Sequence, residues 1–535
     1  GKRLSKLEID CVVICYLHSY AFPEDENRTA EILKKILPSH VQVLTSSSVF
    51  PEFREYERFS TAVLNAALIT ILSAYLDRLT KNVSDMEITS EVKICQSSGG
   101  LMSCSMAKKY PVRASLSGPA AGVQGAIRRA TVAGYNDLIT LDVGGTSADV
   151  ALINNGKPIE VNERLLAGFP IRIPALDVNA VGAGGGSIAW IDKDGLLKVG
   201  PQSAGAEPGP ACYGKGGELA TVTDANVFLG RLNNKALLDG RMPIKESLAE
   251  KVIKDLSNEL NLSMEETALG IVKVACSTMV KAIRSISIER GYDPRDFVLF
   301  VYGGAGALHA MDVARELSIR EVVIPPSPGI LCAEGAMNSF LTIEFVQTIL
   351  MQLDGKGISK IRESKSELEI KVSQWFIQEG VLDKSKEEHW FVGARYFGQN
   401  YELTLPIDFT QDDQLLLESL RARFKDSHES NYGFASPNEP IQIVNIFVKG
   451  IGKLQRPKIP IEKNGNFPEP THFRKVIFDN DGGIQTPVYK RSQLVNGQKI
   501  IGPAIVEQMD STAIIFPRDI CNVDNWGNLI IETKG

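Results

Sequence analysis

Residues 141–150 read Leu-Asp-Val-Gly-Gly-Thr-Ser-Ala-Asp-Val, and these residue types in this order suit the binding of a phosphate group. The apolar runs on either side predict two strands joined by a tight β-hairpin turn. Glycine lets the backbone approach a ligand closely, and the amides of such a turn are good donors to phosphate oxygens. The donors would be the amides of Gly144 and Gly145 and the hydroxyls of Thr146 and Ser147. The alternative is an ordinary hairpin turn that binds nothing.

Two acids flank this turn, and they are the first candidates for metal or acid–base chemistry. Asp142 ends the first strand, where its carboxylate could hold a magnesium ion through bound waters, and Asp149 begins the second strand. Asp177 and Asp224 are further candidates, although a single aspartate is more often a turn or cap residue. Asp224 stands where it could cap a following helix. We favour Asp142 because the phosphate-type turn follows it directly.

Two more glycine clusters could admit a ligand. Gly182–Ser187 is not a dinucleotide fingerprint, because serine occupies its third glycine position, and a flexible surface loop explains it equally well. Gly303–Gly306 lies between an apolar run at Phe297–Tyr302 and a helical pattern that ends at Leu317, with another apolar run at Glu321–Ile324. This order predicts a parallel βαβ unit, whose ligand would bind at the glycine turn. No Gly-x-x-x-x-Gly-Lys-Ser/Thr motif occurs, which disfavours a P-loop fold.

One histidine and one cysteine stand beside glycine motifs. His309 opens the helix after the glycine turn, and a satisfied histidine at a helix start is favoured over a catalytic one. Cys212 lies in a glycine- and proline-rich loop with no histidine nearby in the sequence, so the case for a nucleophile there is weak.

The composition fits a multidomain α/β protein. A chain of 535 residues predicts two to four domains. The net charge of −6 gives no electrostatic reason to expect nucleic acid or an anionic membrane as partner. The eight cysteines form no Cys-x-x-Cys pair, which predicts reduced thiols in a cytoplasmic protein. The longest apolar stretch, Thr61–Leu76, is too short to span a bilayer and predicts a buried helix.

Three regions follow one another along the chain. Residues 1–135 alternate strands and helices, residues 136–345 carry the hairpin and both glycine clusters, and residues 346–535 form a mostly β domain. Residues 449–466 are rich in Lys, Pro and Gly, which predicts a loop or linker. The expected elements include a strand at Cys11–Leu17, helices at Pro23–Ile36 and Ser263–Arg290, and a helical stretch at Lys360–Glu379.

Twelve segments, in order, together resemble one known family. They are His18–Tyr20, Pro51–Arg58, Gln96–Leu101, Leu116–Gly122, Leu141–Val150, Gly182–Ser187, Gly205–Gly214, Thr221–Asn226, Glu289–Arg295, Gly303–His309, Gly502–Gln508 and Asp510–Thr512. This set is similar to the hydantoinase A/oxoprolinase family and covers essentially the whole chain. The family includes ATP-dependent N-methylhydantoin amidohydrolases, 5-oxoprolinases, caprolactam hydrolases and ketone carboxylases.

The resemblance implies an α/β fold with an actin/hexokinase-like (ribonuclease H-like) ATPase core and a C-terminal β-rich domain. Two lobes would close on Mg-ATP, with residues 1–135 as the remainder of the first lobe and residues 136–345 as the second. Residues Gly144, Gly145, Thr146 and Ser147 look like the second phosphate-binding turn, and Gly303, Gly304 and Gly306 resemble the adenosine-side turn. Asp142 looks like the acid nearest to magnesium, and we expect Asp142 and Asp149 to be the catalytic pair.

The chain also departs from the family pattern. The family has a first Asp-x-Gly-Gly-Thr hairpin near its N-terminus, and nothing like it precedes Ile9, so the first lobe is expected to be incomplete. Asn179 and Ala180 stand where the family often has histidine and threonine, and Lys425 replaces the first histidine of a Phe-His-x-x-His-like stretch.

The expected function is therefore that of an ATP-dependent hydrolase subunit. It would open a cyclic amide of the hydantoin, N-methylhydantoin or 5-oxoproline type by phosphorylating the carbonyl oxygen, with ATP and Mg²⁺ as cofactors. A B-type subunit is the expected partner, in a cytoplasmic oligomer that binds neither nucleic acid nor membrane. The alternatives are an ATP-dependent ketone carboxylase subunit and a non-catalytic scaffold for a B-type subunit.

Overall fold

The computed structural model describes residues 3–436, 438–461 and 464–533, which form two compact units built from interleaved segments. Unit 1 contains Gly1–Ser117, Val161–Ala175 and Ser339–Gln455. Unit 2 contains Gly118–Glu160, Leu176–Asn338 and Arg456–Gly535. These units differ from the three expected regions, because the chain crosses between the units several times. The final crossing, after Gln455, falls inside the segment that the sequence predicts as a linker.

Unit 1 is built around a six-stranded sheet with the strand order β19-β18-β20-β17-β4-β3. A separate pair of parallel strands, β1 and β2, begins the unit. The antiparallel pair β8 and β9 lies where the chain enters unit 1 at Val161 and leaves it after Ala175. The strands are β1 (Cys11–Ile14), β2 (Gln42–Thr45), β3 (Lys93–Cys95), β4 (Leu101–Ser103), β8 (Glu160–Leu166), β9 (Phe169–Leu176), β17 (Leu341–Gln352), β18 (Lys386–Tyr396), β19 (Leu403–Pro406) and β20 (Ile441–Gly452).

Six helices accompany these strands. They are α1 (Glu24–Ile36), α2 (Ser46–Val49), α3 (Glu55–Asp85), α4 (Cys104–Lys109), α11 (Gly355–Gln378) and α12 (Asp413–Tyr432). The predicted strand begins at Cys11 but ends at Ile14 and not at Leu17, and the predicted helix ends at Ile36 as expected. Helix α12 is a long helix inside the region expected to be mostly β, and its buried Leu416, Leu420 and Phe424 repeat at the four-residue spacing of an amphipathic helix.

Helix α3 is longer and more exposed than the sequence predicts. It has 31 residues and buries one face, whereas Val63 and Ile71 on another face are 53% and 72% exposed. By length and composition it is, within the described ranges, the one helix apolar enough to cross a membrane. Its fully buried Arg58 and Asn65 serve packing inside unit 1, since Asn65 donates to the carbonyl of Lys109 and Arg58 to that of Glu52. The prediction of a buried helix is thus correct for one face.

Unit 2 contains a nine-stranded sheet with the order β10-β6-β5-β15-β16-β27-β26-β23, and β7 also pairs with β6. Strand β15 lies parallel to both β5 and β16, which confirms the βαβ unit predicted around the 303–306 turn. The C-terminal strand β27 continues this sheet antiparallel to β16. The nine strands are β5 (Leu138–Val143), β6 (Ala148–Asn154), β7 (Lys157–Pro158), β10 (Val178–Val181), β15 (Val298–Tyr302), β16 (Glu321–Ile324), β23 (Lys499–Ile501), β26 (Ile520–Val523) and β27 (Leu529–Glu532).

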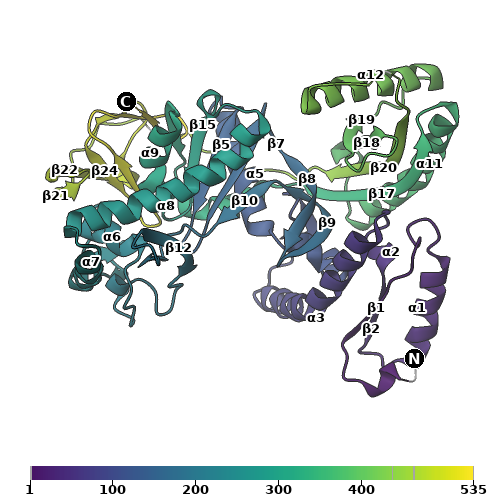
Figure 1. Cartoon of the computed structure of the whole chain (residues 1–535), viewed down its shortest axis with the longest axis horizontal. Helices are drawn as coiled ribbons and strands as arrows, with labels where there is room; N and C mark the ends of the chain where they lie inside the picture. Colours follow the sequence, from purple (N-terminus) through teal and green to yellow (C-terminus); the bar gives the residue numbers. More distant parts are fainter. Residues whose placement is uncertain (1–2, 437, 462–463, 534–535) are drawn as a thin grey trace. The chain divides into compact units, whose positions relative to one another are not determined.

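Smaller strand groups and six helices complete unit 2. The strands are β11 (Ser187–Ile191) with β12 (Leu197–Ser203), β13 (Ala236–Leu237) with β14 (Met242–Pro243), and a four-stranded sheet of β21 (His472–Ile477), β22 (Gly483–Lys490), β24 (Ala504–Glu507) and β25 (Thr512–Ile515). The helices are α5 (Ser117–Val132), α6 (Val222–Phe228), α7 (Glu246–Leu260), α8 (Met264–Ile286), α9 (Gly306–Leu317) and α10 (Leu331–Asn338). The yellow C-terminal strands β22 and β24 lie near α9 in Figure 1.

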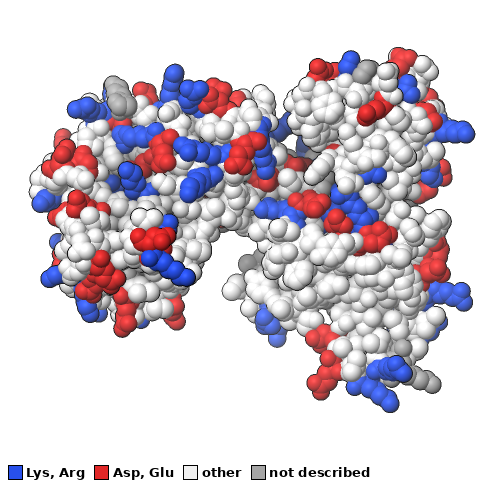
Figure 2. Space-filling view, in the orientation of Figure 1, with Lys and Arg blue, Asp and Glu red and all other residues white. Residues whose placement is uncertain are grey.

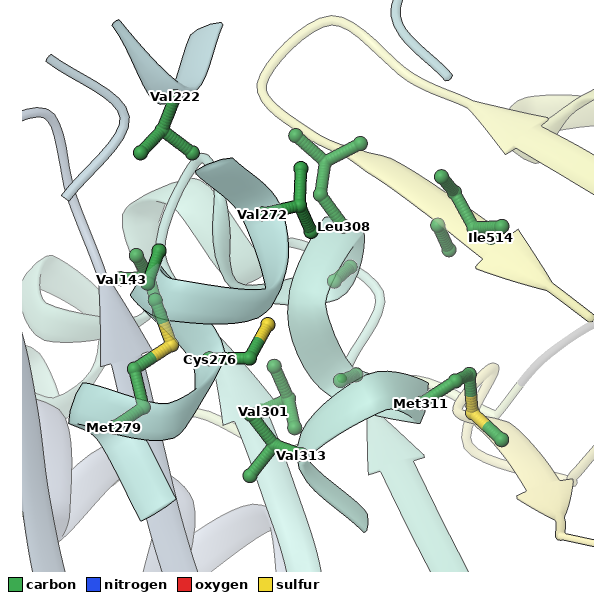
Figure 3. Close-up of a cluster of buried hydrophobic side chains, with 14 of the residues drawn as sticks. Val143, Val222, Val272, Cys276, Met279, Val301, Leu308, Met311, Val313 and Ile514 are labelled. Carbon is green, nitrogen blue, oxygen red and sulfur yellow. The ribbon is translucent and has the colours of Figure 1, made fainter. Parts of the chain in front are cut away.

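The core of unit 2 holds the hairpin in place. Figure 3 shows Val143 of β5 packed with Cys276 and Met279 of α8, Val301 of β15 and Leu308 of α9. Helix α8 begins as predicted, because Ser263 and Glu266 form a reciprocal capping box. The surface is charged with both signs, and lysine, arginine and acidic side chains are interspersed over the face shown in Figure 2.

Candidate functional site

Three glycine motifs that are far apart in the sequence meet at the tip of the β5–β6 hairpin. The amide of Gly185 donates to the carbonyl of Gly144 over 3.0 Å, and the amide of Gly186 donates to that of Gly145 over 2.6 Å. From the third motif, the Ala305 amide donates to the carbonyl of Val143 over 2.9 Å. The hairpin turn is therefore fixed from both sides by backbone hydrogen bonds.

The second glycine cluster is packed too tightly for a flexible surface loop. Gly184, Gly185 and Gly186 are all buried. A Cβ atom on Gly184 would lie 2.6 Å from the backbone nitrogen of Thr146, so only glycine allows the two segments this close. Thr223 secures the cluster from the other side, because its amide and its hydroxyl both donate to the carbonyl of Gly185 over 2.8 Å. Of the two explanations left open by the sequence, the surface loop is excluded.

A cavity of about 810 Å³ opens beside these motifs, entirely within unit 2. We call it the glycine-lined cavity, because Gly144, Gly145, Gly185 and Gly304 form part of its wall. Its volume suits a ligand of nucleotide size. The rest of the wall combines apolar and polar side chains, among them Leu232, Asn233, Lys235, Leu237, Asp239, Met242, Leu308, Tyr489, Lys490, Gln508, Asp510 and Thr512.

The tip of the hairpin is open to a ligand. Gly145 and Thr146 are exposed, and a Cβ atom on Gly145 would meet no neighbouring atom within 4 Å. The amide of Gly144 donates to the carbonyl of Ser147 over 3.0 Å, which closes the turn. The tip thus has the rigidity and the open approach that phosphate binding requires.

The two flanking acids face each other across the hairpin. Asp142 and Asp149 are paired positions of β5 and β6, and Tyr302 of β15 is paired with Asp142 on its other side. All three side chains lie on the sheet face that packs against α5, since their strand neighbours Leu138, Ala151 and Phe300 do so. Among the described residues, the wall of the glycine-lined cavity includes neither acid. Each acid lies two residues from the hairpin tip, beside it and not in it.

The carboxyl group of Asp142 is half-buried and closely packed against its neighbours. The Cys332 thiol donates to its Oδ2 atom over 3.4 Å, and a Cβ atom on Gly303 would collide with its Oδ1 atom. Burial raises the pKa of Asp142, and the hydrogen bond from Cys332 offsets part of that rise. Gly122 of α5 permits this close packing, because a Cβ atom there would lie 2.9 Å from the sulfur of Cys332.

The remaining sequence candidates have structural roles. Asp224 is fully buried in a capping box with Thr221 and accepts hydrogen bonds from the Ala211 and Cys212 amides, which confirms the cap prediction. Asp177 forms an ion pair with Arg290. These contacts hold loops and a helix in place and offer no free carboxylate to a ligand.

Neither His309 nor Cys212 is placed for catalysis. His309 is fully buried, its Nδ1 atom lies 3.6 Å from the sulfur of Cys276, and burial lowers its pKa to about 3. It is therefore a neutral core residue and not a catalytic one, but it is not the fully satisfied histidine that the sequence favours, because its buried Nε2 atom has no hydrogen-bond partner within the described part of the chain. Burial beside Asp224 raises the pKa of Cys212 far above its ordinary value, which rules out a thiolate nucleophile.

Sequence reasoning missed much of the cavity wall. Residues 232–242 and 489–490 carry no motif, and their place in the wall follows from the fold alone. The segment Glu507–Thr512 lines the cavity as well, and its signal was available, because Gly502–Gln508 and Asp510–Thr512 are among the motifs quoted above. Strand pairing of β27 with β16 anchors this C-terminal segment in unit 2.

Comparison with known proteins identifies the family of this chain. The hydantoinase/oxoprolinase family matches residues 58–345, and its C-terminal domain matches residues 354–532. The chain belongs to the hydantoinase/oxoprolinase family. The two matches meet close to residue 345, next to the expected start of the third region. The family assignment from the motifs is thereby confirmed.

Two relatives are informative. Caprolactamase subunit alpha of Pseudomonas jessenii is 34% identical over 95% of this chain and 74% of that protein. The crystal structure of the ATP-dependent caprolactamase from that organism superposes with a TM-score of 0.86 at 32% identity, over all of this chain and 78% of that one. The 5-oxoprolinase of Saccharomyces cerevisiae is 34% identical over 97% of this chain, which spans 41% of that protein.

An acetone carboxylase is also similar. Its nucleotide-free structure, determined in a study of ATP-dependent acetone carboxylation, superposes with a TM-score of 0.80 at 25% identity. The match covers 98% of this chain and 76% of that chain. This chain therefore shares a mixed α/β fold with a strand-rich C-terminal part with both solved structures.

Proposed function

We propose that this chain is an ATP-dependent hydrolase subunit that opens a cyclic amide. The observation that carries the proposal is the meeting of three glycine motifs at one cavity of nucleotide size. Family members named for their activity, a caprolactamase and a 5-oxoprolinase, support the reaction class. The site is built within one unit, so its geometry depends on no contact between units.

In this proposal ATP occupies the glycine-lined cavity, and unit 2 is the second lobe of an actin/hexokinase-like core. The apolar side chains of Leu232, Leu237 and Met242 would cover the base, and the Gly304 turn would lie along the nucleoside. The phosphates would then reach the hairpin tip, where the amide of Gly145 and the hydroxyls of Thr146 and Ser147 would be the donors. The amide of Gly144, which the sequence also suggests as a donor, is instead bonded to the carbonyl of Ser147 within the turn.

The acids beside the tip fit a magnesium ion. The described residues include no group of three or more His, Cys, Asp or Glu side chains that could hold a metal by themselves. Magnesium at phosphate sites is commonly bound through one or two carboxylates, with phosphate oxygens and waters completing the shell. Asp142 and Asp149 supply two carboxylates on one sheet face. The bound ion would neutralise charge on the transferred phosphoryl group.

The chemistry balances with two waters. The amide carbonyl oxygen attacks the γ-phosphorus, the bond to ADP breaks, and an O-phosphorylated imidate forms. One water adds to the imidate carbon, and the ring nitrogen takes a proton and leaves as an amine, which gives an acyl phosphate. A second water adds to the acyl carbon, phosphate leaves, and an amino acid remains. The hairpin amides position the transferred group, and its in-line transfer depends on that positioning.

The proposal extends to partner and compartment. A companion B-type subunit would complete the enzyme, in keeping with the name of caprolactamase subunit alpha. All eight cysteines are free thiols, which suits the reducing cytoplasm. An ATP-dependent ketone carboxylase subunit is the second candidate, favoured by the similarity to acetone carboxylase.

A substrate panel tests this function. We expect ADP release, in the presence of the companion subunit, to rise at least about 10-fold over background with one of 5-oxoproline, hydantoin, N-methylhydantoin or caprolactam, because activation by phosphorylation requires an amide oxygen. Acetone with bicarbonate is included in the panel to test the ketone carboxylase alternative. Stimulation by acetone alone would establish the carboxylase instead, and no stimulation by any compound would leave a scaffold as the function.

A further inference from the structure

Unit 1 has a cavity of its own, with a volume of about 610 Å³. Motif residues Ser19, Tyr20 and Pro51 line it, and the proposed ATP chemistry in unit 2 makes no use of them. Hydroxyl groups of Ser47, Ser48 and Tyr110 add polar wall, while Phe50, Ile173 and Trp375 add apolar wall. We call this the unit 1 cavity.

Arg172 is the most informative residue of the unit 1 cavity. Its side chain lines the cavity although the residue is only 7% exposed. Its backbone amide donates to the Thr61 hydroxyl over 2.9 Å, which fixes the main chain, and its guanidinium lies 5.8 Å from the centre of the Phe50 ring. Its Nε and Nη1 atoms are buried and have no hydrogen-bond acceptor within the described part of the chain. Buried donors of a charged group are costly unless an acceptor is supplied.

Further cations line the same cavity. Lys109 and Arg113 lie 5.1 Å from the centre of the Tyr110 ring, measured from the Nζ and Cζ atoms, and Lys371 also belongs to the wall. Burial lowers the pKa of Arg113, because its partners replace only part of its lost hydration. Among the described residues, the acids in the cavity wall are Glu344 and Glu367. The wall therefore contains four cationic side chains and two carboxylates. The wall is thus arranged for an anion with an apolar body.

We propose that the unit 1 cavity binds a small organic carboxylate through the guanidinium of Arg172. A guanidinium presents paired donors that match the geometry of a carboxylate. Two sources share this chemistry: the carboxylate already present on a cyclic amide such as 5-oxoproline, and the one created when any cyclic amide is hydrolysed. The choice between these sources rests on the proposed function, whereas carboxylate binding itself does not.

Glu52 is the internal competitor for Arg172. Its Oε2 atom lies 3.6 Å from Nη1 of Arg172, in ion-pair range but beyond a hydrogen bond. Burial raises the pKa of Glu52 to about 7, with Glu402 raising it further and Arg172, Arg54 and a hydrogen bond from Asn445 lowering it. The protonated form of Glu52, favoured at lower pH, leaves Arg172 to the ligand. Above pH 7 its charge competes with the ligand, so carboxylate affinity should fall as the pH rises.

Calorimetric titration of the full chain without ATP tests this inference. We expect 5-oxoproline or the open-chain acids glutamate and 6-aminohexanoate to bind at least about 10-fold more tightly than neutral caprolactam. Arg172→Gln should weaken that binding at least about 10-fold, whereas Arg129→Gln, which changes an equally buried, ion-paired arginine of unit 2, should not. Preference for 5-oxoproline indicates the substrate carboxylate, and preference for the open-chain acids indicates the product; either outcome supports the site.

The Glu52→Gln variant distinguishes a lost binding site from a misfolded protein. This variant should bind the carboxylate about 3-fold to 10-fold more tightly than wild type at pH 8 and equally at pH 6, a gain that a damaged fold does not produce. Asp142→Asn should bind with unchanged affinity, which separates this site from the ATP chemistry in unit 2. Equal affinity for caprolactam and the acids, or affinity unaffected by Arg172→Gln, would overturn the proposal.

Discussion

Asparagine in place of Asp142 should abolish ATP turnover, by at least about 100-fold, while the protein stays folded. The expected loss is that of an electrostatic group which positions charge around the transferred phosphoryl group. Asparagine has the same shape as aspartate, so the packing against Gly303 and the contact with Cys332 are kept. Steady-state ADP release and thermal unfolding of the same preparation measure the two effects.

The direction of the stability effect follows from the pKa. Burial raises the pKa of Asp142 in the folded chain, so its neutral form is the one that favours folding. This stabilising contribution of Asp142 is fully present at a pH below its pKa in the unfolded chain. It is lost as the pH rises through its pKa in the folded chain. The charged form of this buried carboxylate therefore weakens the fold, and Asp142→Asn, which removes the charge, should not lower the melting temperature.

A matched control lies at the start of the same strand. Asp137 precedes β5 and accepts a hydrogen bond from the Asn155 amide over 2.7 Å, away from the hairpin tip. Asp137→Asn should leave ATP turnover within about 2-fold of wild type. Full activity in Asp142→Asn, or equal losses in both variants, would contradict the assignment of the acid pair.

Gly184→Ala should impair both the fold and ATP turnover. The new Cβ atom would lie 2.6 Å from the Thr146 nitrogen, and those neighbouring atoms are backbone atoms that cannot rotate away. Overpacking of this kind costs about 1–3 kcal/mol, and relief requires movement of the hairpin tip. We expect ATP turnover to fall at least about 10-fold and the denaturation midpoint to decrease.

The control for this variant is Gly118→Ala, near the start of α5. A Cβ atom on Gly118 would meet nothing within 4 Å, so the change adds a methyl group without a clash. Its activity and its stability should match those of wild type. Wild-type activity in Gly184→Ala would show that the second glycine cluster does not hold the phosphate turn.

Local features of this chain were predictable from its sequence. The hairpin at residues 141–150, the βαβ unit around Gly303–Gly306 and the capping box of α8 each depend on neighbours within a few tens of residues. The same holds for the cap formed by Asp224, whose partner Thr221 is three residues away. Apolar spacing and turn residues are sufficient to predict structure that depends on residues so close in the sequence.

Long-range packing was not predictable in the same way. Composition gave no means to decide whether Gly182–Ser187 was a surface loop, because the decision depends on contacts with Thr146 and Thr223. The third region was expected to be one β-rich domain, whereas residues after Gln455 complete the sheet of unit 2 through β27. The unit 1 cavity depends on Arg172, a residue that no motif contains.

The central claim is that the amide carbonyl oxygen is phosphorylated, and an oxygen label follows that atom directly. A turnover-competent cyclic amide carrying ¹⁸O at the carbonyl is incubated with ATP, the chain and its companion subunit. We expect ¹⁸O in the released inorganic phosphate, because the labelled C–O bond breaks when phosphate leaves the acyl carbon. Phosphate containing only solvent and ATP oxygens, with all of the label retained in the ring-opened acid, would contradict this route.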